Sequence, residues 1–145
     1  PVSQVAETVA RGALLGARGN SGVILSQFFQ GLASALSQCT ECDKGDLIRG
    51  FQLASQAAYK AVGEPVEGTM LTVIRESAQA VERNGAEAKD LLSLWDVACR
   101  AATEALAYTP SQLPVLREAG VVDAGGQGMV AILEGAGAFL RGDEV

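Results

Sequence analysis

Histidine is absent from the 145-residue sequence, and cysteine and aromatic residues are scarce. Without histidine, Ser-His-Asp and Cys-His catalysis, histidine-based zinc sites and histidine acid-base chemistry are all excluded. The three cysteines, Cys39, Cys42 and Cys99, are an odd and low number. That number does not form a disulfide framework and is typical of a reducing cytosol, so we expect a cytoplasmic protein.

Long apolar runs are absent too. No run approaches the roughly 18 residues of a membrane-spanning helix, and no signal peptide opens the chain, so we predict no membrane insertion. The formal net charge of −6 argues against a nucleic-acid surface and against a polybasic membrane patch. A phosphate ligand stays compatible with this charge, because a backbone nest or a divalent metal holds phosphate inside an acidic protein.

The length and the 48% of hydrophobic residues fit one domain with a sizeable core, which we predict over residues 1–145. Because the chain starts at Pro1 rather than Met, we expect a fragment of a longer protein. Apolar residues recur at spacings of three and four nearly throughout, and no strand-length alternation occurs, which predicts an all-α bundle. The expected helices cover about 2–14, 21–36, 46–62, 69–81, 90–106 and 125–140, with a short one near 112–118.

The ends of these helices carry their own signals. We expect polar residues at N-caps, glycines in left-handed C-caps, and prolines between helices. The predicted N-caps are Ser21, Asp46, Thr69 and Asp90, the predicted C-caps are Gly63, Gly85 and Gly142, and the prolines are Pro65, Pro110 and Pro114.

The first of three glycine-bearing junctions is Gly16–Gly22. Its glycines let a ligand approach the main chain, Asn20 and Ser21 offer side-chain donors, and the following helix N-terminus favours an anion. Arg18 would add a charge-assisted bond to a phosphate. The alternative is an ordinary turn with Ser21 as helix cap. The junction matches neither a Walker A loop nor a dinucleotide-binding fingerprint.

The second junction is Gly63–Met70 and the third is Gly120–Gly128. In the second, Thr69 would cap a helix and contact a ligand, and Met70 would either line a planar-ring pocket or belong to the core. In the third, the only charge is Asp123. Its carboxylate would accept hydrogen bonds from a ribose, or cap the following helix, and the two roles are compatible.

Cys39-x-x-Cys42 has the spacing of a redox or metal pair. A structural zinc site needs four ligands, and only Cys99 remains to join the pair. A thioredoxin-type motif needs a preceding strand, which the sequence lacks. We therefore favour two loop thiols. The carboxylates form no close pair such as Asp-x-Asp, so the sequence predicts no metal cluster.

Taken together and in this order, the segments Gly16–Gln27, Glu67–Glu76 and Val121–Gly128 resemble the N-terminal nucleotide-binding domain, of Dak2 or DhaL type, of a fatty-acid kinase A subunit. The dihydroxyacetone kinase L subunit is a more distant relative. The resemblance covers the chain from about Val5 to Leu140. It implies an antiparallel eight-helix barrel that binds ATP or ADP at one end.

The resemblance also assigns residues. It places Gly19, Asn20, Ser21 and Gly22 in the phosphate-binding loop, Thr69 and Met70 beside the adenine, Asp123, Ala124 and Gly125 in a later nucleotide-contacting loop, and Gly63 on the nucleotide side. It assigns no catalytic residue to this chain. The family holds two Mg²⁺ ions with an Asp-Gly-Asp-Thr-Gly-type motif, which this sequence lacks. We therefore expect the metal ligands upstream, and a fragment that is inactive alone.

For the longer protein, the resemblance implies transfer of the γ-phosphoryl group of ATP to a fatty-acid carboxylate. A separate lipid-binding protein would present the fatty acid. The alternatives are a dihydroxyacetone-type kinase subunit and a non-catalytic nucleotide-binding module. The Arg-Gly-Asn-Ser-Gly form of the first junction favours the fatty-acid branch. A homodimer through regions outside this chain is left open.

Overall fold

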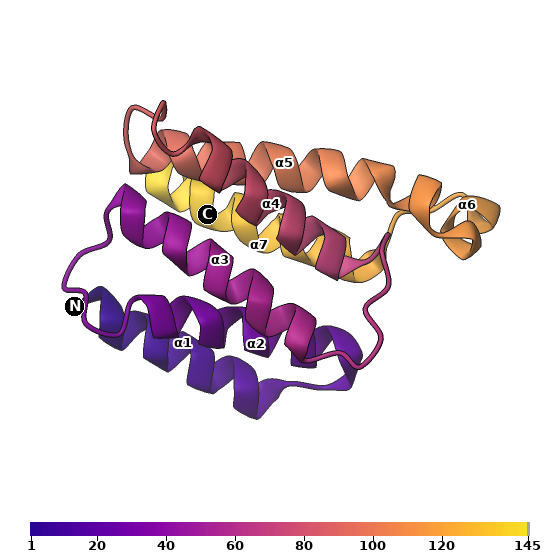
Figure 1. Ribbon diagram of the computed structural model, residues 1–145, viewed down its shortest axis with the longest axis horizontal. Coiled ribbons are helices and arrows are strands. Elements are labelled where there is room, and N and C mark those ends of the chain that lie inside the picture. Colours follow the sequence, from indigo (N-terminus) through magenta and orange to yellow (C-terminus); the bar gives the residue numbers. More distant parts are fainter. Residues whose placement is uncertain (145) are drawn as a thin grey trace. The chain divides into compact units, whose positions relative to one another are not determined.

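The computed structural model describes residues 1–144, which form helices joined by short loops (Figure 1). The helices are α1 (Val2–Gly16), α2 (Gly19–Ala35), α3 (Lys44–Lys60), α4 (Met70–Asn84), α5 (Leu91–Gln112), α6 (Pro114–Ala119) and α7 (Ala124–Arg141). No strand occurs among these residues. The all-α prediction is confirmed, including the short helix near residues 112–118. Among residues 1–144, no helix combines the length and the hydropathy of a membrane span.

The chain divides into two compact units, Pro1–Pro65 and the residues from Val66 onward. In the first unit, α2 packs against both α1 and α3. Phe28 of α2 and Phe51 of α3 are almost fully buried, with their ring centroids 6.1 Å apart in an edge-to-face contact. Such pairs favour this geometry because the positive ring edge meets the negative ring face.

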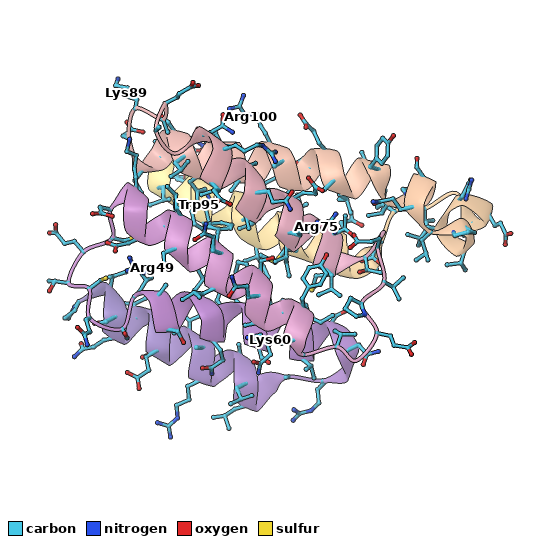
Figure 2. The ribbon with its side chains drawn as sticks, in the orientation of Figure 1. Arg49, Lys60, Arg75, Lys89, Trp95 and Arg100 are labelled. Atoms are coloured by element: carbon cyan, nitrogen blue, oxygen red, sulfur yellow. The ribbon has the colours of Figure 1, made fainter. Side chains whose placement is uncertain are left out.

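In the second unit, α4, α5 and α7 pack against one another, and α6 follows α5. The core is aliphatic, with Ile74, Leu94, Met129 and Leu133 at most 1% exposed. Trp95 of α5, labelled in Figure 2, donates its indole N–H to the Leu133 carbonyl of α7 at 2.8 Å. This bond adds a polar tie to the apolar contact of the two helices.

Two of the four predicted N-caps are confirmed. Thr69 accepts from the Leu71 amide at 3.3 Å, and Asp90 accepts from the Ser93 amide at 2.8 Å. The prediction for Asp46 is wrong, because Asp43 caps α3 and Asp46 lies three residues further on. The two carboxylates form a capping box, in which each accepts the other residue's amide N–H.

Of the three glycines predicted as left-handed C-caps, one is confirmed in both position and conformation. Gly142 is left-handed with a φ of +81°. Gly85 has a right-handed φ of −60°, and Gly63 is not among the glycines with positive φ. The prediction for Gly63 is wrong, since Ala61 is the C-cap of α3. Gly85 is the C-cap of α4, as predicted, but its conformation is right-handed instead of left-handed.

The prediction for Pro110 is wrong as well. Pro65 lies between helices and Pro114 is the first residue of α6, where the missing N–H removes no helix bond. Pro110, in contrast, lies inside α5. The helix continues because the neighbouring Thr109 hydroxyl bonds the carbonyl that a proline leaves without its donor.

Candidate functional site

The first junction lies in the unit Pro1–Pro65 and is shorter than the sequence suggests. Helix α2 already begins at Gly19, whose φ of +65° only glycine adopts readily. Arg18 occupies the N-cap position, so Ser21 lies in the first turn and the prediction of Ser21 as cap is wrong. Because α2 begins two residues before Ser21, this serine cannot occupy the N-cap position.

The amide groups at this end of α2 have no side-chain acceptor. The first N–H groups of any helix lack partners within the helix, and here they include those of Gly19, Asn20 and Ser21. All three residues are exposed. The Arg18 guanidinium donates to the Ala17 and Leu15 carbonyls at 2.7 and 3.3 Å, so it folds back onto the end of α1.

Gly22 is packed more tightly than its neighbours. A Cβ at this position would lie 3.2 Å from the Ala17 Cα. Gly22 therefore holds the first turn of α2 close to the end of α1. Gly63, which also belongs to this unit, is exposed, and a Cβ there would have nothing within 4 Å.

The second junction enters the unit from Val66 onward. The Thr69 hydroxyl donates to the Val66 carbonyl at 2.7 Å, which locks the turn that it caps. Met70 is 5% exposed, so of its two predicted roles, lining a pocket or belonging to the core, the structure confirms the core role. A contact between Met70 and a bound ring stays a prediction.

A polar network holds this junction on α4. The Gly68 amide donates to the Thr72 hydroxyl at 2.8 Å, and that hydroxyl donates to the Glu67 carboxylate at 2.5 Å. Arg75, labelled on α4 in Figure 2, forms an ion pair with the same carboxylate. The backbone around Gly68 is therefore fixed from two sides.

The third junction ends at the start of α7. Asp123 caps the helix by accepting from the Gly126 amide at 2.8 Å, which confirms its predicted capping role. Ala124 and Gly125 form the first turn of α7. Gly126 is buried, and a Cβ there would lie 3.0 Å from Val73 Cγ2 of α4. The helix start thus packs directly on the neighbouring helix.

Thr109, near the C-terminal end of α5, contacts both the second and the third junction. Its hydroxyl accepts from the Asp123 amide at 3.1 Å, and its carbonyl oxygen lies 3.1 Å from the Cβ position of Gly68. Sequence reasoning missed this residue. The signal was a Thr-Pro pair within a helical apolar pattern.

The described residues show no metal centre. Residues 1–144 contain no group of three or more His, Cys, Asp or Glu side chains that could hold a metal ion. Cys39, Cys42 and Cys99 are free thiols. Burial, followed by the charges of Asp46 and Asp43, raises the pKa of Cys42 to about 11.

Comparison with known proteins identifies the family. The DAK2 domain model matches residues 1–138. The chain belongs to the DAK2 domain family. Membership indicates a DhaL-like nucleotide-binding module of a kinase-related kind.

Two similar proteins come from Staphylococcus aureus. One is the uncharacterized protein SAB1090 of the bovine strain RF122 / ET3-1, and the other is the uncharacterized protein SAUSA300_1119 of strain USA300. Each is 42% identical over 144 residues, which is 99% of this chain. The chain spans 26% of the length of either relative.

Proposed function

We propose that this DAK2 domain binds ATP or ADP through its three glycine-bearing junctions. In the longer protein it would serve a kinase that phosphorylates a fatty-acid carboxylate. The observation that carries the proposal is the N-terminus of α2, where the exposed residues Gly19, Asn20 and Ser21 begin a helix that has no side-chain cap. Such a terminus favours a phosphate by its dipole and its N–H groups.

The unit from Val66 onward would hold the nucleoside. The cap of α7 uses Oδ2 of Asp123, and the other carboxylate oxygen makes no hydrogen bond within residues 1–144. That oxygen would accept a ribose hydroxyl. Thr69 and Met70 would lie beside the adenine, and Ala124 and Gly125 would present the amides of a second helix start. Gly63 would lie on the nucleotide side.

The reaction balances without a general base from this chain. A fatty-acid carboxylate is already ionised near pH 7, so no proton has to be removed. One of its oxygens would form a bond to the γ-phosphorus. The bond from that phosphorus to the bridging oxygen would break, and ADP would leave with the electron pair. The products are an acyl phosphate and ADP.

The described residues do not fit a magnesium site, so no step is assigned to a metal held by this chain. We propose that the Mg²⁺ ligands lie in a part of the longer protein outside this sequence, and that this domain alone is inactive. A separate lipid-binding protein would present the fatty acid. We propose that the reaction takes place in the cytoplasm, where ATP is plentiful.

The test uses the full-length protein with MgATP and a fatty acid carried by a lipid-binding protein. We expect ADP and acyl phosphate in equal amounts. If dihydroxyacetone is phosphorylated and the fatty acid is not, the protein is a dihydroxyacetone-type kinase subunit instead. Nucleotide binding without any transfer would leave a non-catalytic module, and absence of binding would contradict the whole proposal.

A matched pair of variants tests the α2 terminus. Ser21→Ala should weaken ADP binding by roughly 0.5–1.5 kcal/mol, the usual value of one hydrogen bond. Because Ser21 caps nothing, its removal should leave the melting temperature unchanged. Ser34→Ala, in the last turn of the same helix, is the control and should change neither quantity. Unchanged affinity in Ser21→Ala would remove this residue from the site.

A further inference from the structure

Pro110 leaves a gap in the hydrogen bonding of α5. In a continuous helix the N–H at position 110 would donate to the carbonyl of Leu106, but proline has no N–H. The Thr109 hydroxyl donates to that carbonyl at 2.7 Å instead. A side chain therefore replaces the missing main-chain donor, and α5 continues to Gln112.

The same hydroxyl oxygen has a second partner outside the helix. It accepts the backbone N–H of Asp123 at 3.1 Å. A hydroxyl carries one donor and two acceptor lone pairs, so both bonds form at once. Thr109 is fully buried, where an unpaired N–H or carbonyl is costly and a hydrogen bond is strengthened by the low dielectric.

The main chain of Thr109 supports the second junction. Its carbonyl accepts the Leu113 amide at 3.1 Å. Gly68 packs against this last turn so closely that a Cβ would lie 3.0 Å from the Leu113 Cβ. Thr109 therefore hydrogen-bonds the turn that leads to Asp123 and lies in contact with the turn that leads to Thr69.

We infer that Thr109 is a positioning residue of the nucleotide site. Its hydroxyl holds the Asp123 junction at a fixed distance from the Gly68 junction, without touching the nucleotide itself. This inference rests on the proposed function. The Thr109 hydroxyl thus has two tasks. It donates a hydrogen bond to the Leu106 carbonyl, and it accepts the amide that positions Asp123.

Two variants of the full-length protein separate these tasks. Thr109→Val keeps the shape of the side chain but loses both bonds. The double variant Thr109→Val/Pro110→Ala restores a main-chain donor for Leu106 while the Asp123 amide stays without the hydroxyl. We expect the double variant to recover most of the melting temperature lost by Thr109→Val, but not its ADP affinity, which should stay about fivefold or more below wild type. Thr109→Ser keeps the hydroxyl and should bind ADP within about twofold of wild type.

Hydrogen exchange supplies a readout that does not depend on the nucleotide. The Asp123 and Gly126 amides should exchange faster in the double variant than in wild type, and Thr109→Ser should restore their protection. Ser77→Ala is the control, because Ser77 is a buried hydroxyl that bonds only its own helix, at the Val73 carbonyl. It should leave both the affinity and these two amides unchanged.

The outcomes are distinct. If wild type binds ADP and the double variant binds it equally well, the inference is overturned and the proposed function stands. Unchanged exchange at Asp123 would overturn the inference whatever the affinity. If wild type does not bind ADP, the proposed function fails and the inference fails with it.

Discussion

Gly31 of α2 lies directly against the backbone of Ala54 in α3. A Cβ at Gly31 would lie 2.5 Å from the Ala54 nitrogen, which is closer than a Cβ atom approaches a non-bonded neighbour in proteins. The neighbouring atoms belong to a main chain, which cannot rotate away as a side chain can. The contact therefore depends on the absence of a side chain at this position.

From this contact we predict that Gly31→Ala destabilises the protein. Overpacking a tight contact costs typically about 1–3 kcal/mol, which outweighs the gain in helix propensity of about 1 kcal/mol. Urea unfolding measures the change. Gly12→Ala is the control. A Cβ at Gly12, inside α1, would have no neighbouring atom within 4 Å, so this variant should stabilise the protein. Equal effects of the two variants would contradict the close packing of α2 on α3.

A second pair of variants separates backbone strain from packing. Gly68 and Gly120 both have left-handed φ values, +85° and +68°, but only Gly68 has close neighbours. Gly120→Ala should lose about 1–2 kcal/mol of stability from strain alone. Gly68→Ala should lose more, since overpacking against α5 adds about 1–3 kcal/mol. Thermal unfolding of the two variants checks the order, and the reverse order would contradict the contact with α5.

Asp123 allows its two roles to be measured apart. Asp123→Asn keeps a capping oxygen, so stability should change by only a few tenths of a kcal/mol. The lost charge should nevertheless weaken ADP binding, by about 1.5–3 kcal/mol if a ribose hydroxyl donates to the carboxylate. Calorimetric titration and thermal unfolding together check this prediction.

The control for Asp123 is the other aspartate cap of the same unit. Asp90 caps α5 with the same 2.8 Å bond, at the far end of that helix from Thr109. Asp90→Ala should lose roughly 0.5–2 kcal/mol of stability and no ADP affinity. An affinity loss as large as that of Asp123→Asn would mean that both act only through stability.

We predict that the Cys42 thiol is alkylated slowly at neutral pH. Its pKa of about 11, raised from an ordinary 9.0 by burial and by Asp46 and Asp43, keeps it protonated at neutral pH. Two pKa units leave about 100-fold less thiolate below pH 9, and alkylation requires the thiolate. We expect the alkylation rate of Cys42 to rise with pH until about pH 11. A plateau near pH 9 would show that the thiol is not perturbed.

The sequence predicts the helices well because apolar residues spaced three and four apart line one face of an α-helix, and this pattern can be read locally. It predicts their ends less well. Ser21, Asp46 and Pro110 each carry a local signal that a neighbour overrides: the left-handed Gly19, the capping box of Asp43, and the Thr109 hydroxyl. Signals of this kind have to be read in combination rather than one residue at a time.

The candidate site was predictable in part. Asp123 and Thr69 cap helices as their residue types indicate. Thr109 was missed because its bond to Asp123 spans 14 residues, and no local pattern reports such a contact. Its place next to Pro110 is the one local clue, since a helix that continues past a proline needs another donor.

We propose above all that this domain binds a nucleotide. An ADP titration followed by NMR on the full-length protein, with labelled glycine and serine amides, tests it most directly. We predict that the amide signals of Gly19, Ser21, Gly22 and Gly125 shift and saturate as ADP is added, and that the Gly45 signal stays fixed. No shift of these four signals at saturating ADP would contradict the proposal.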